Sequence, residues 1–327
     1  MTAATLVTGG AGFIGSHLVD RLLAAGERVV VLDDLNDYYA PAQKVENVRL
    51  ARQSPLMRFV QGDIRDPVAV QAALSDWPVH RVVHLAARAG VQPSLADPAL
   101  YADVNVTGSA VILQACARVG IEHVVFASSS SVYGASRTTP FSEFEQPLHP
   151  VSPYAATKLA NELQCWTFNH LSGGSVTCLR FFTAYGPRNR PDMAIFKFSR
   201  AILEGTEIQL YGQETKRDFT YVDDIVDGVV AALGRPQGML VCNLGGGTPI
   251  PVQDLVAGLE RRLQHKARVR RVDLPPGDVP VTWADNAQAQ RALGWTAHTD
   301  LEAGLDRFVD WFLHSQATIS ATPGARP

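Results

Sequence analysis

Residues 5–15, TLVTGGAGFIG, join a short β-branched segment to a glycine-rich turn and then to a helical pattern. Gly9, Gly12 and Gly15 recur at every third position, and the apolar residues of 13–26 have the spacing of a helix. Glycines in such a turn permit a tight bend and a close approach of the backbone to a pyrophosphate. The N-terminus of the helix adds amide donors and the positive end of its dipole. A glycine-rich turn is weak evidence alone, but its place between a strand and a helix predicts a dinucleotide site.

An acidic residue follows at the distance that such a site requires. The second expected strand, RVVVLDD (28–34), brings Asp33 to its end, about 20 residues beyond the glycine turn. A carboxylate there can accept hydrogen bonds from the adenosine ribose and would repel a 2′-phosphate, so NAD is favoured over NADP. Asp63 and Ile64 end the next strand and would lie beside the adenine, although an ordinary surface turn explains their spacing almost as well.

Short apolar strands alternate with helical segments up to about residue 184, which predicts an α/β fold with a doubly wound parallel sheet. The strands are apolar along most of their length, and strands of this kind are covered on both faces. Farther along, Asp223 is expected to cap an apolar helix. The strands expected after the second have the sequences RFVQGDI, VHRVVHLAA, HVVFASS and VTCLRFF.

The pattern divides the chain into two lobes. Residues 1–183 are expected to form an NAD-binding Rossmann domain, to which 220–242 return. Residues 184–219 and 243–316 are expected to form a smaller α/β lobe that binds the substrate. The small and polar residues near the C-terminus predict a flexible tail over 317–327. Ligands of such folds bind in the crevice at the carboxyl ends of the strands.

The composition is that of an ordinary globular enzyme. The 327 residues are 46% hydrophobic and 19% charged, with a net charge of −3. No basic excess favours nucleic acid, and no apolar run approaches the ~18 residues of a membrane span. The N-terminus lacks the pattern of a signal peptide, so a cytoplasmic protein is expected. The four cysteines form no C-x-x-C pair, and we expect reduced, buried thiols rather than a metal site or disulfides.

A tyrosine and a lysine lie one helical turn apart in SPYAATKLANEL (152–163). Ser152 and Pro153 are typical of a helix start, and the helix then places Tyr154 and Lys158 on one face. Tyrosine has an ordinary pKa of about 10, so a base that works at neutral pH needs about 4 kcal/mol of phenolate stabilisation. The lysine ammonium and the positive ring of a bound nicotinamide could together supply it. Taken alone, Y-x-x-x-K is as well explained by an ordinary surface pair; its place after a nucleotide turn and a serine-rich strand end favours catalysis.

These stretches resemble the extended short-chain dehydrogenase/reductases that modify nucleotide sugars. The resemblance covers about residues 5–314 and rests on TGGAGFIG, the strand-end Asp33, GDI (62–64), HLAA (84–87), SSSVYG (129–134) and YAATK (154–158). It implies a tightly held NAD, with a UDP- or dTDP-sugar in the second lobe. The cofactor-binding residues that it implies are Gly9, Gly12, Phe13, Ile14, Gly15, Asp33, Asp63, Ile64, Leu85, Ala86, Ala87, Tyr154 and Lys158.

The resemblance also implies a reaction. Tyr154 corresponds to the catalytic base, Lys158 to its partner, and Ser129 to a residue that shares the proton relay. The first step in this family is hydride transfer from sugar carbon 4 to NAD, which gives a 4-keto sugar. Relatives that go on to eliminate water or CO₂ carry an acidic residue near the strand end, where this chain has SSSSVYG. Epimerisation at carbon 4 is therefore expected.

The identity of the sugar depends on the stretches LNDYY, HLAARAGVQPSL, RFFTAYGPRNRPDMA and RDFTY. Together they resemble the UDP-glucuronate 4-epimerases most. A sugar carboxylate calls for hydroxyl or amide donors and a cation, for which Ser130, Ser131, Thr183 at the end of the next strand, and Arg190 are the candidates. Such a clamp would also keep the 4-keto sugar, a β-keto acid, from losing CO₂. Alternatively, Arg190 contacts a phosphate or water, and the serines satisfy backbone groups of the turn.

Two residues of the second lobe match family positions that hold the nucleotide. Arg217 corresponds to an arginine at the diphosphate, and Asp278 to an acid at the uridine ribose. A salt bridge between the lobes and an ordinary turn acid are the respective alternatives. The resemblance also implies a homodimer, in which two helices of each subunit pair; here 98–120 and the Tyr154 helix would supply them.

Three positions depart from the family pattern. Asp34 stands where many relatives have asparagine, Arg88 where a neutral residue is expected, and Arg188-Asn189 where tryptophan-glycine is commoner. Arg88 could reach the pyrophosphate or simply the surface. These departures leave the sugar preference more open than the reaction type. The alternatives are a UDP-glucose/UDP-galactose 4-epimerase and a catalytically inactive protein that binds NAD, a nucleotide sugar or a protein partner.

Overall fold

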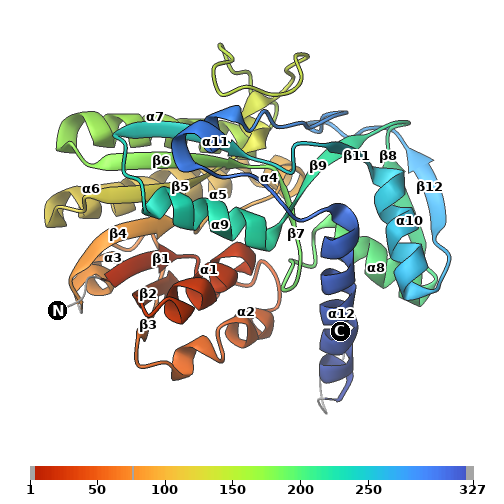
Figure 1. Cartoon of the computed structure of the whole chain (residues 1–327), viewed down its shortest axis with the longest axis horizontal. Coiled ribbons are helices and arrows are strands. Elements are labelled where there is room, and N and C mark those ends of the chain that lie inside the picture. Colours follow the sequence, from red (N-terminus) through yellow and green to blue (C-terminus); the bar gives the residue numbers. More distant parts are fainter. Residues whose placement is uncertain (1–3, 76, 322–327) are drawn as a thin grey trace.

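A seven-stranded parallel sheet forms the centre of the molecule (Figure 1). The structure, a computed structural model, describes residues 4–75 and 77–321 of the chain. The strands of this sheet are β1 (Ala4–Thr8), β2 (Arg28–Asp33), β3 (Met57–Gln61), β4 (Val79–His84), β5 (His123–Ser129), β6 (Ser175–Phe181) and β10 (Met239–Leu244). They follow the order β10-β6-β5-β4-β1-β2-β3, so the winding reverses between β1 and β4. This arrangement confirms the predicted doubly wound sheet.

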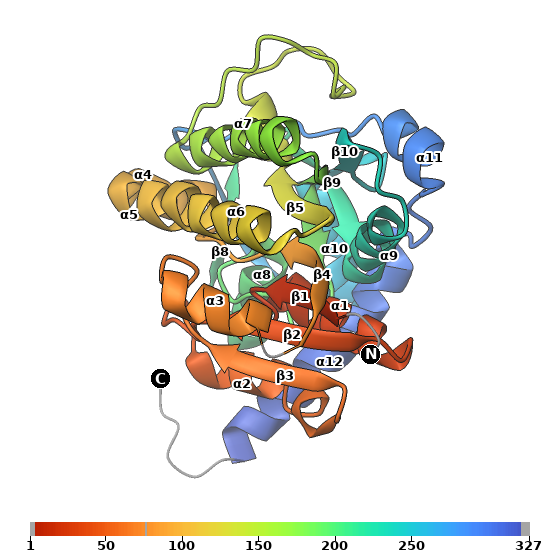
Figure 2. The same ribbon diagram turned by 90° about the vertical axis from the view of Figure 1, so that its left-hand side faces the viewer.

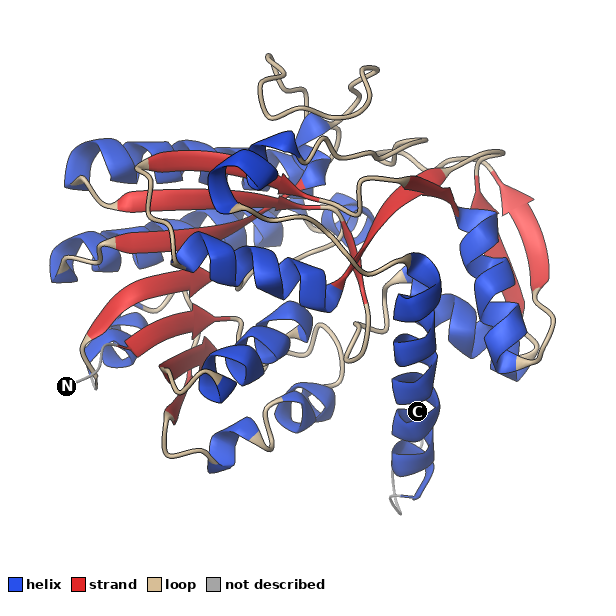
Figure 3. Ribbon diagram, in the orientation of Figure 1, coloured by secondary structure: helices blue, strands red, loops and turns tan. Residues whose placement is uncertain are grey.

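Helices cover both faces of this sheet because successive side chains of each strand point to opposite sides (Figures 2 and 3). Val7 and Val31 pack against one set of helices, whereas Leu6 and Val30 pack against the other. The first set is α1 (Phe13–Ala24), α9 (Val222–Leu233) and α11 (Ala287–Leu293). The second set is α3 (Pro67–Ser75), α6 (Gly108–Val119) and α7 (Pro153–Ser172).

A smaller lobe lies beyond the carboxyl ends of the sheet strands (Figure 1). Its core joins Phe196, Leu255 and Phe308, one from each of its three main helices. The helices are α8 (Ala194–Glu204), α10 (Val252–Leu263) and α12 (Leu301–Ala321), and the strands are β7 (Thr183–Tyr185), β8 (Glu207–Tyr211), β9 (Lys216–Tyr221), β11 (Pro249–Pro251) and β12 (Arg268–Val272). The strands form a three-stranded sheet, β11-β9-β7, and a two-stranded sheet, β12-β8.

Short helices complete the chain. They are α2 (Pro41–Asn47), α4 (Val91–Ala96), α5 (Pro98–Tyr101), a π-helix (Ala102–Thr107) and the 3-10 helices Ala51–Gln53 and Ser130–Tyr133. In the part of the chain that the structure describes, no helix has the length and apolar character needed to cross a membrane.

Two local predictions are wrong. Thr183 does not end β6, which stops at Phe181; it begins β7, which leaves the main sheet and pairs with β9. Asp223 does not cap α9, because the N-cap residue is Tyr221 and Asp223 lies in the first turn. A carboxylate in that turn still interacts favourably with the helix dipole.

The predicted limits of the lobes also need correction. Strand β10 continues to Leu244, two residues into the predicted second lobe. Helix α11 and Trp295 also fall in the predicted second lobe, but they pack in the core around α1 and α9. Helix α12 continues to Ala321, so the expected tail over 317–327 begins inside a helix; residues 322–327 lie outside the described part. The division into two lobes stays a proposal, with β10 and α11 assigned to the first.

Candidate active site

One cleft at the carboxyl ends of the central strands is lined by all the predicted site residues. Its volume is about 420 Å³, and both lobes contribute to its walls. The predicted residues that line it are Gly9, Gly12, Phe13, Ile14, Gly15, Asp33, Asp63, Ile64, Leu85, Ala86, Ala87, Ser129, Ser130, Ser131, Tyr154, Lys158, Thr183, Arg190, Arg217 and Asp278. Their individual roles remain predictions, but the fold brings them to one place.

The glycine turn is packed too tightly for larger residues. Gly9 has a φ of 69°, and a Cβ on it would lie 2.8 Å from the backbone nitrogen of Ala86. A Cβ on Gly15 would collide with the carbonyl oxygen of Gly9. Helix α1, all of which the structure describes, has Gly12 as its N-cap, with no side-chain cap and no acidic residue in the first turn. Its first amides are therefore open to an anion, and the turn fits the diphosphate of NAD.

Asp33 is buried at the end of β2 and accepts hydrogen bonds from the backbone amides of Ala11 (3.0 Å) and Leu35 (2.9 Å). Burial raises its pKa, and these hydrogen bonds act in the opposite direction. Lys44 of α2 places a positive charge near both Asp33 and Asp34. This lysine was missed in the sequence, where no local pattern marks it, and its charge offsets two neighbouring carboxylates at the predicted ribose site.

Two of the predicted acids already have arginine partners. Arg65 donates to Asp63 from Nε at 3.0 Å and lowers the pKa of that carboxyl. Arg217 and Asp278 form an ion pair of 2.7 Å, but both belong to the predicted second lobe, so this pair is not the salt bridge between the lobes that was the alternative for the arginine. Both side chains of that pair nevertheless line the cleft. A nucleotide bound there would have to share them.

Tyr154 lies at the start of α7, where the predicted helix start is confirmed, and the Ser152 hydroxyl accepts a hydrogen bond of 3.2 Å from a backbone amide of the first turn. One turn later, Lys158 donates from Nζ to the carbonyl oxygen of Ala127 at 2.8 Å. Its Nζ is 6.0 Å from the centre of the Tyr154 ring. The Ser129 hydroxyl is close enough to Tyr154 to act on the pKa of the Tyr154 phenol, so the three predicted catalytic residues are neighbours.

The surroundings of Tyr154 act on its acidity in opposite directions. Burial raises the pKa of Tyr154, while the hydrogen bond with Ser129 and the charge of Arg190 act to lower it. Burial also lowers the pKa of Lys158 to about 8. The expected lowering of the Tyr154 pKa below its ordinary value is therefore not found in the protein alone. If Tyr154 is the predicted base, the other expected source, the positive ring of a bound oxidised nicotinamide, would have to stabilise its phenolate.

Arg190 is held by a carboxylate of its own loop. Asp192 accepts from Arg190 Nε and Nη2, both at 2.9 Å. Tyr38 donates from its hydroxyl to Asp192 at 3.1 Å, and the Arg190 guanidinium lies 5.6 Å from the centre of the Tyr38 ring. Tyr38 and Asp192 lie in the stretches LNDYY and RFFTAYGPRNRPDMA, where no local pattern marks either residue as part of a site. Nothing local predicts that these two stretches meet.

Arg88 lies in the cleft, which disfavours the surface alternative. The side chain of Asn105 binds its backbone on both sides, accepting from the Arg88 amide at 2.8 Å and donating to its carbonyl at 3.0 Å. The Arg88 guanidinium is 5.6 Å from the centre of the Tyr38 ring, the same ring that Arg190 approaches. The guanidinium groups of Arg88 and Arg190 therefore both lie near the Tyr38 ring inside the cleft.

His84 is buried in the core and is linked through Thr8 to the backbone that lines the cleft. Its ring nitrogens lie 2.7 Å from the Thr8 hydroxyl and 3.1 Å from the Ser109 hydroxyl. Thr8 in turn accepts from the amide of Ala86, which lines the cleft, at 3.2 Å. Burial lowers the pKa of His84 to about 3. The imidazole is therefore neutral in the folded protein at ordinary pH.

This buried imidazole predicts acid sensitivity. Its folded pKa lies below its unfolded pKa of about 6.5, so acidification protonates the unfolded chain first and favours unfolding. Between about pH 7 and about pH 5, wild type should lose about 2 kcal/mol more unfolding free energy than His84→Asn. Urea unfolding across this range measures the difference. The exposed His80→Asn is the control, and equal pH dependence in all three proteins would contradict the assignment.

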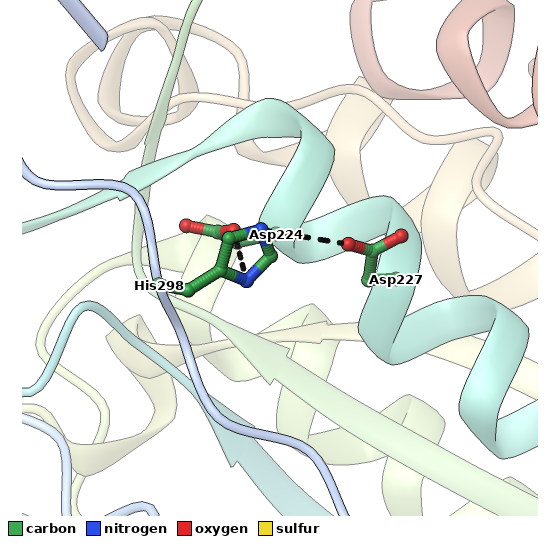
Figure 4. Close-up of side chains that lie close together, drawn as sticks. All are labelled: Asp224, Asp227 and His298. Atoms are coloured by element: carbon green, nitrogen blue, oxygen red, sulfur yellow. Dashed lines mark ion pairs between the residues drawn. The ribbon is translucent and has the colours of Figure 1, made fainter. Parts of the chain in front are cut away.

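A group of three potential metal ligands lies elsewhere, and none of its members lines the cleft (Figure 4). Asp224 is buried and accepts from the amide and hydroxyl of Thr299 at 3.0 and 3.1 Å, with His298 Nδ1 3.0 Å away. Asp227 is already paired with Arg21. These contacts join α9 to the segment before α12, and we assign them no metal.

The sequence of this chain is similar to a known protein family and to individual known proteins. The family model described as the NAD dependent epimerase/dehydratase family matches residues 5–245. UDP-glucuronate 4-epimerase 4 of Arabidopsis thaliana is 43% identical, over 94% of this chain and 75% of the relative. UDP-glucuronate 4-epimerase of Thermodesulfobacterium geofontis is 41% identical, over 94% of this chain and 95% of the relative.

A solved structure agrees with these sequence matches. The crystal structure of UDP-glucuronic acid 4-epimerase from Bacillus cereus, in complex with UDP-glucuronic acid and NAD, superposes with a TM-score of 0.90 at 33% identity. The match covers 95% of this chain and 99% of that one. The similarity thus extends over both lobes and includes the whole cleft.

Proposed function

Because this chain belongs to the NAD dependent epimerase/dehydratase family, we propose that it inverts carbon 4 of a UDP-sugar and that this sugar is UDP-glucuronate. The proposal rests on the contents of one cleft, which Tyr154, Ser129 and Arg190 line together with the glycine turn. Residues 127–134, all of them described, contain no carboxylate that could promote the elimination of water. The similarity to UDP-glucuronate 4-epimerases supports the choice of sugar.

In the proposed mechanism, Tyr154 as the phenolate accepts the proton of the sugar O4 hydroxyl, and Ser129 hydrogen-bonds the same oxygen. A bound NAD would supply the acceptor for the carbon 4 hydride and the source of its return. The amides at the start of α1 would hold the cofactor diphosphate, and Asp33 would hold the adenosine ribose. The 4-keto sugar turns over within the cleft, and Tyr154 then returns the proton to O4.

Ser131 orients the Ser129 hydroxyl of this relay. It donates to Ser129 Oγ at 2.9 Å, so that the hydrogen of Ser129 is free to bond Tyr154 or the sugar. We assign Ser130, Thr183 and Arg190 to the sugar carboxylate, as their hydroxyls and guanidinium suit it. Ser131 has a single hydroxyl hydrogen, so it would donate to that carboxylate only by releasing Ser129. A carboxylate fixed in this way would resist the loss of CO₂ to which a β-keto acid is prone.

Proton NMR of the purified protein with UDP-glucuronate, without added NAD, tests this function. The proposal predicts UDP-galacturonate as the product and little conversion of UDP-glucose or UDP-galactose. Conversion of only the neutral sugars would keep the mechanism and refute the carboxylate site. If none of the three sugars is converted, even after NAD is added, the proposal that the protein is a UDP-sugar 4-epimerase is refuted.

One observation favours a second substrate class. Asp192 offsets the charge of Arg190, so the cation offered to a sugar carboxylate is partly neutralised. Tolerance of neutral UDP-sugars is therefore the alternative function. The same NMR comparison distinguishes it by the ratio of the rates for UDP-glucuronate and UDP-galactose.

We further propose a cytoplasmic homodimer. The four cysteines are buried free thiols, as expected in a reducing compartment. Helices α6 and α7 lie side by side on one face (Figure 2), and on α7 the apolar side chains of Leu163 and Trp166 are 65% and 62% exposed. Large apolar side chains of this exposure, three residues apart on one helix, suit a second copy of the chain.

The dimer yields a prediction. Replacing Trp166 by lysine should raise the dimer dissociation constant at least about tenfold, because it buries an unpaired charge in place of a large apolar side chain. Light scattering after size exclusion, at several protein concentrations, measures this change. Val68→Lys on α3 is the matched control, since Val68 is 76% exposed on a different helix. A monomeric wild type, or an unchanged Trp166→Lys dimer, would contradict the proposal.

A further inference from the structure

The segment between β7 and α8, residues 186–193, borders both the predicted cofactor site and the predicted sugar site of the cleft (Figure 1). Its Arg190 and Met193 line the cleft together with Gly12 of the glycine turn. The segment therefore carries a predicted sugar-binding residue and borders the predicted cofactor site. We call residues 186–193 the strap.

Helices of the cofactor side hold the first half of the strap through three polar contacts. His17 of α1 donates from Nε2 to the carbonyl oxygen of Pro187 at 2.9 Å. Asp20 of α1 pairs with Arg188 at 2.7 Å. Gln43 of α2 donates to the backbone carbonyl of Asn189 at 3.1 Å. All three contacts come from the helices that border the glycine turn and the ribose site.

The backbone of the strap is held in an unusual conformation. Arg188 has a φ of 61°, which a residue with a side chain rarely adopts, so its surroundings must hold it there. Next to it, Asn189 is fully buried, and its Oδ1 accepts from the amide of Arg190 at 2.7 Å. At the far end, Asp192 accepts from the hydroxyl of Tyr38. Both ends are thus fixed to the Rossmann domain.

We propose that Asp20 and Arg188 are positioning residues, which fasten the strap across the cofactor side of the cleft, retain NAD between catalytic cycles and present Arg190 to the sugar. This inference rests on the proposed NAD-dependent reaction. NAD held on the glycine turn could then leave quickly only when the strap detaches from α1. The Asp20–Arg188 pair is partly exposed, so its attraction should contribute only modestly to holding the strap on α1. Two like charges at these positions should repel and loosen the strap more than loss of the pair alone would.

Cofactor release tests this proposal directly. The protein is loaded with NADH and chased with excess NAD, and the fall in NADH fluorescence gives the dissociation rate. Asp20→Arg places two guanidinium groups opposite each other and should speed release about tenfold. The double variant Asp20→Arg with Arg188→Asp restores opposite charges and should return the rate to within about twofold of wild type.

The control lies one residue away. Arg21 pairs with Asp227 of α9 and does not contact the strap, so Arg21→Glu reverses a charge on the same helix and should leave release unchanged. Melting temperatures of the cofactor-free proteins identify variants that fail to fold, for which the milder Asp20→Asn replaces Asp20→Arg. A rate for Asp20→Arg no faster than that for Arg21→Glu, or a double variant without recovery, would overturn the proposal. A wild type that binds no NADH would refute the NAD-dependent reaction itself, and the strap with it.

Discussion

Tyr154→Phe is expected to lower kcat by about a thousandfold or more, because the variant lacks the group proposed to accept the O4 proton. The change removes one oxygen atom from a half-buried ring and leaves Lys158, Asp33 and the glycine turn in place. NAD and UDP-glucuronate should therefore bind within a few-fold of wild type. Single-turnover measurements should show no reduced nicotinamide, because hydride transfer depends on removal of that proton.

Tyr211→Phe is the matched control for this loss. Tyr211 is 40% exposed at the end of β8 and does not line the cleft, so its variant should keep wild-type turnover. Titration calorimetry with UDP-glucuronate separates loss of binding from loss of chemistry. Turnover of Tyr154→Phe near the wild-type rate would remove Tyr154 from the mechanism.

Arg190→Ala is expected to reduce kcat/KM for UDP-glucuronate about a hundredfold, since it removes the proposed charge-assisted contact to the carboxylate. The loss for UDP-galactose should stay below about tenfold, reflecting only the effect of the Arg190 charge on Tyr154. Initial rates for the two sugars, each measured as an epimer yield over time, give the ratio that matters.

Arg200→Ala provides the comparison. Arg200 lies on the same helix that follows the strap, with its guanidinium over the Phe196 ring, and does not line the cleft. Its variant should change neither rate. Equal losses for both sugars in Arg190→Ala would move Arg190 from the carboxylate to the phosphates.

The elements that follow from local patterns could be predicted from the sequence. The glycine turn, the alternation of strands and helices, and the cap at Ser152 each depend on residues close together in the chain. Their physics is local, because a positive φ, a pleat and a cap need only neighbouring residues. The same reasoning placed Tyr154 and Lys158 on one face of α7.

Contacts between distant segments could not be predicted in this way. Asp192 meets Tyr38 and Lys44 approaches Asp33 only because packed helices bring loops of the cleft together. Thr183 was misplaced because the apolar run of β6 continues past the point where the backbone leaves the sheet. Each miss concerns where an element turns or what it meets, which depends on packing rather than on periodicity.

The most direct test of the account follows a deuterium atom at carbon 4 of UDP-glucuronate. If the cofactor takes this atom as hydride and returns it to the other face, it never exchanges with water, whereas the O4 proton does. The account predicts UDP-galacturonate that retains deuterium at carbon 4 when the reaction runs in ordinary water. Inverted product carrying solvent hydrogen at carbon 4 would contradict it.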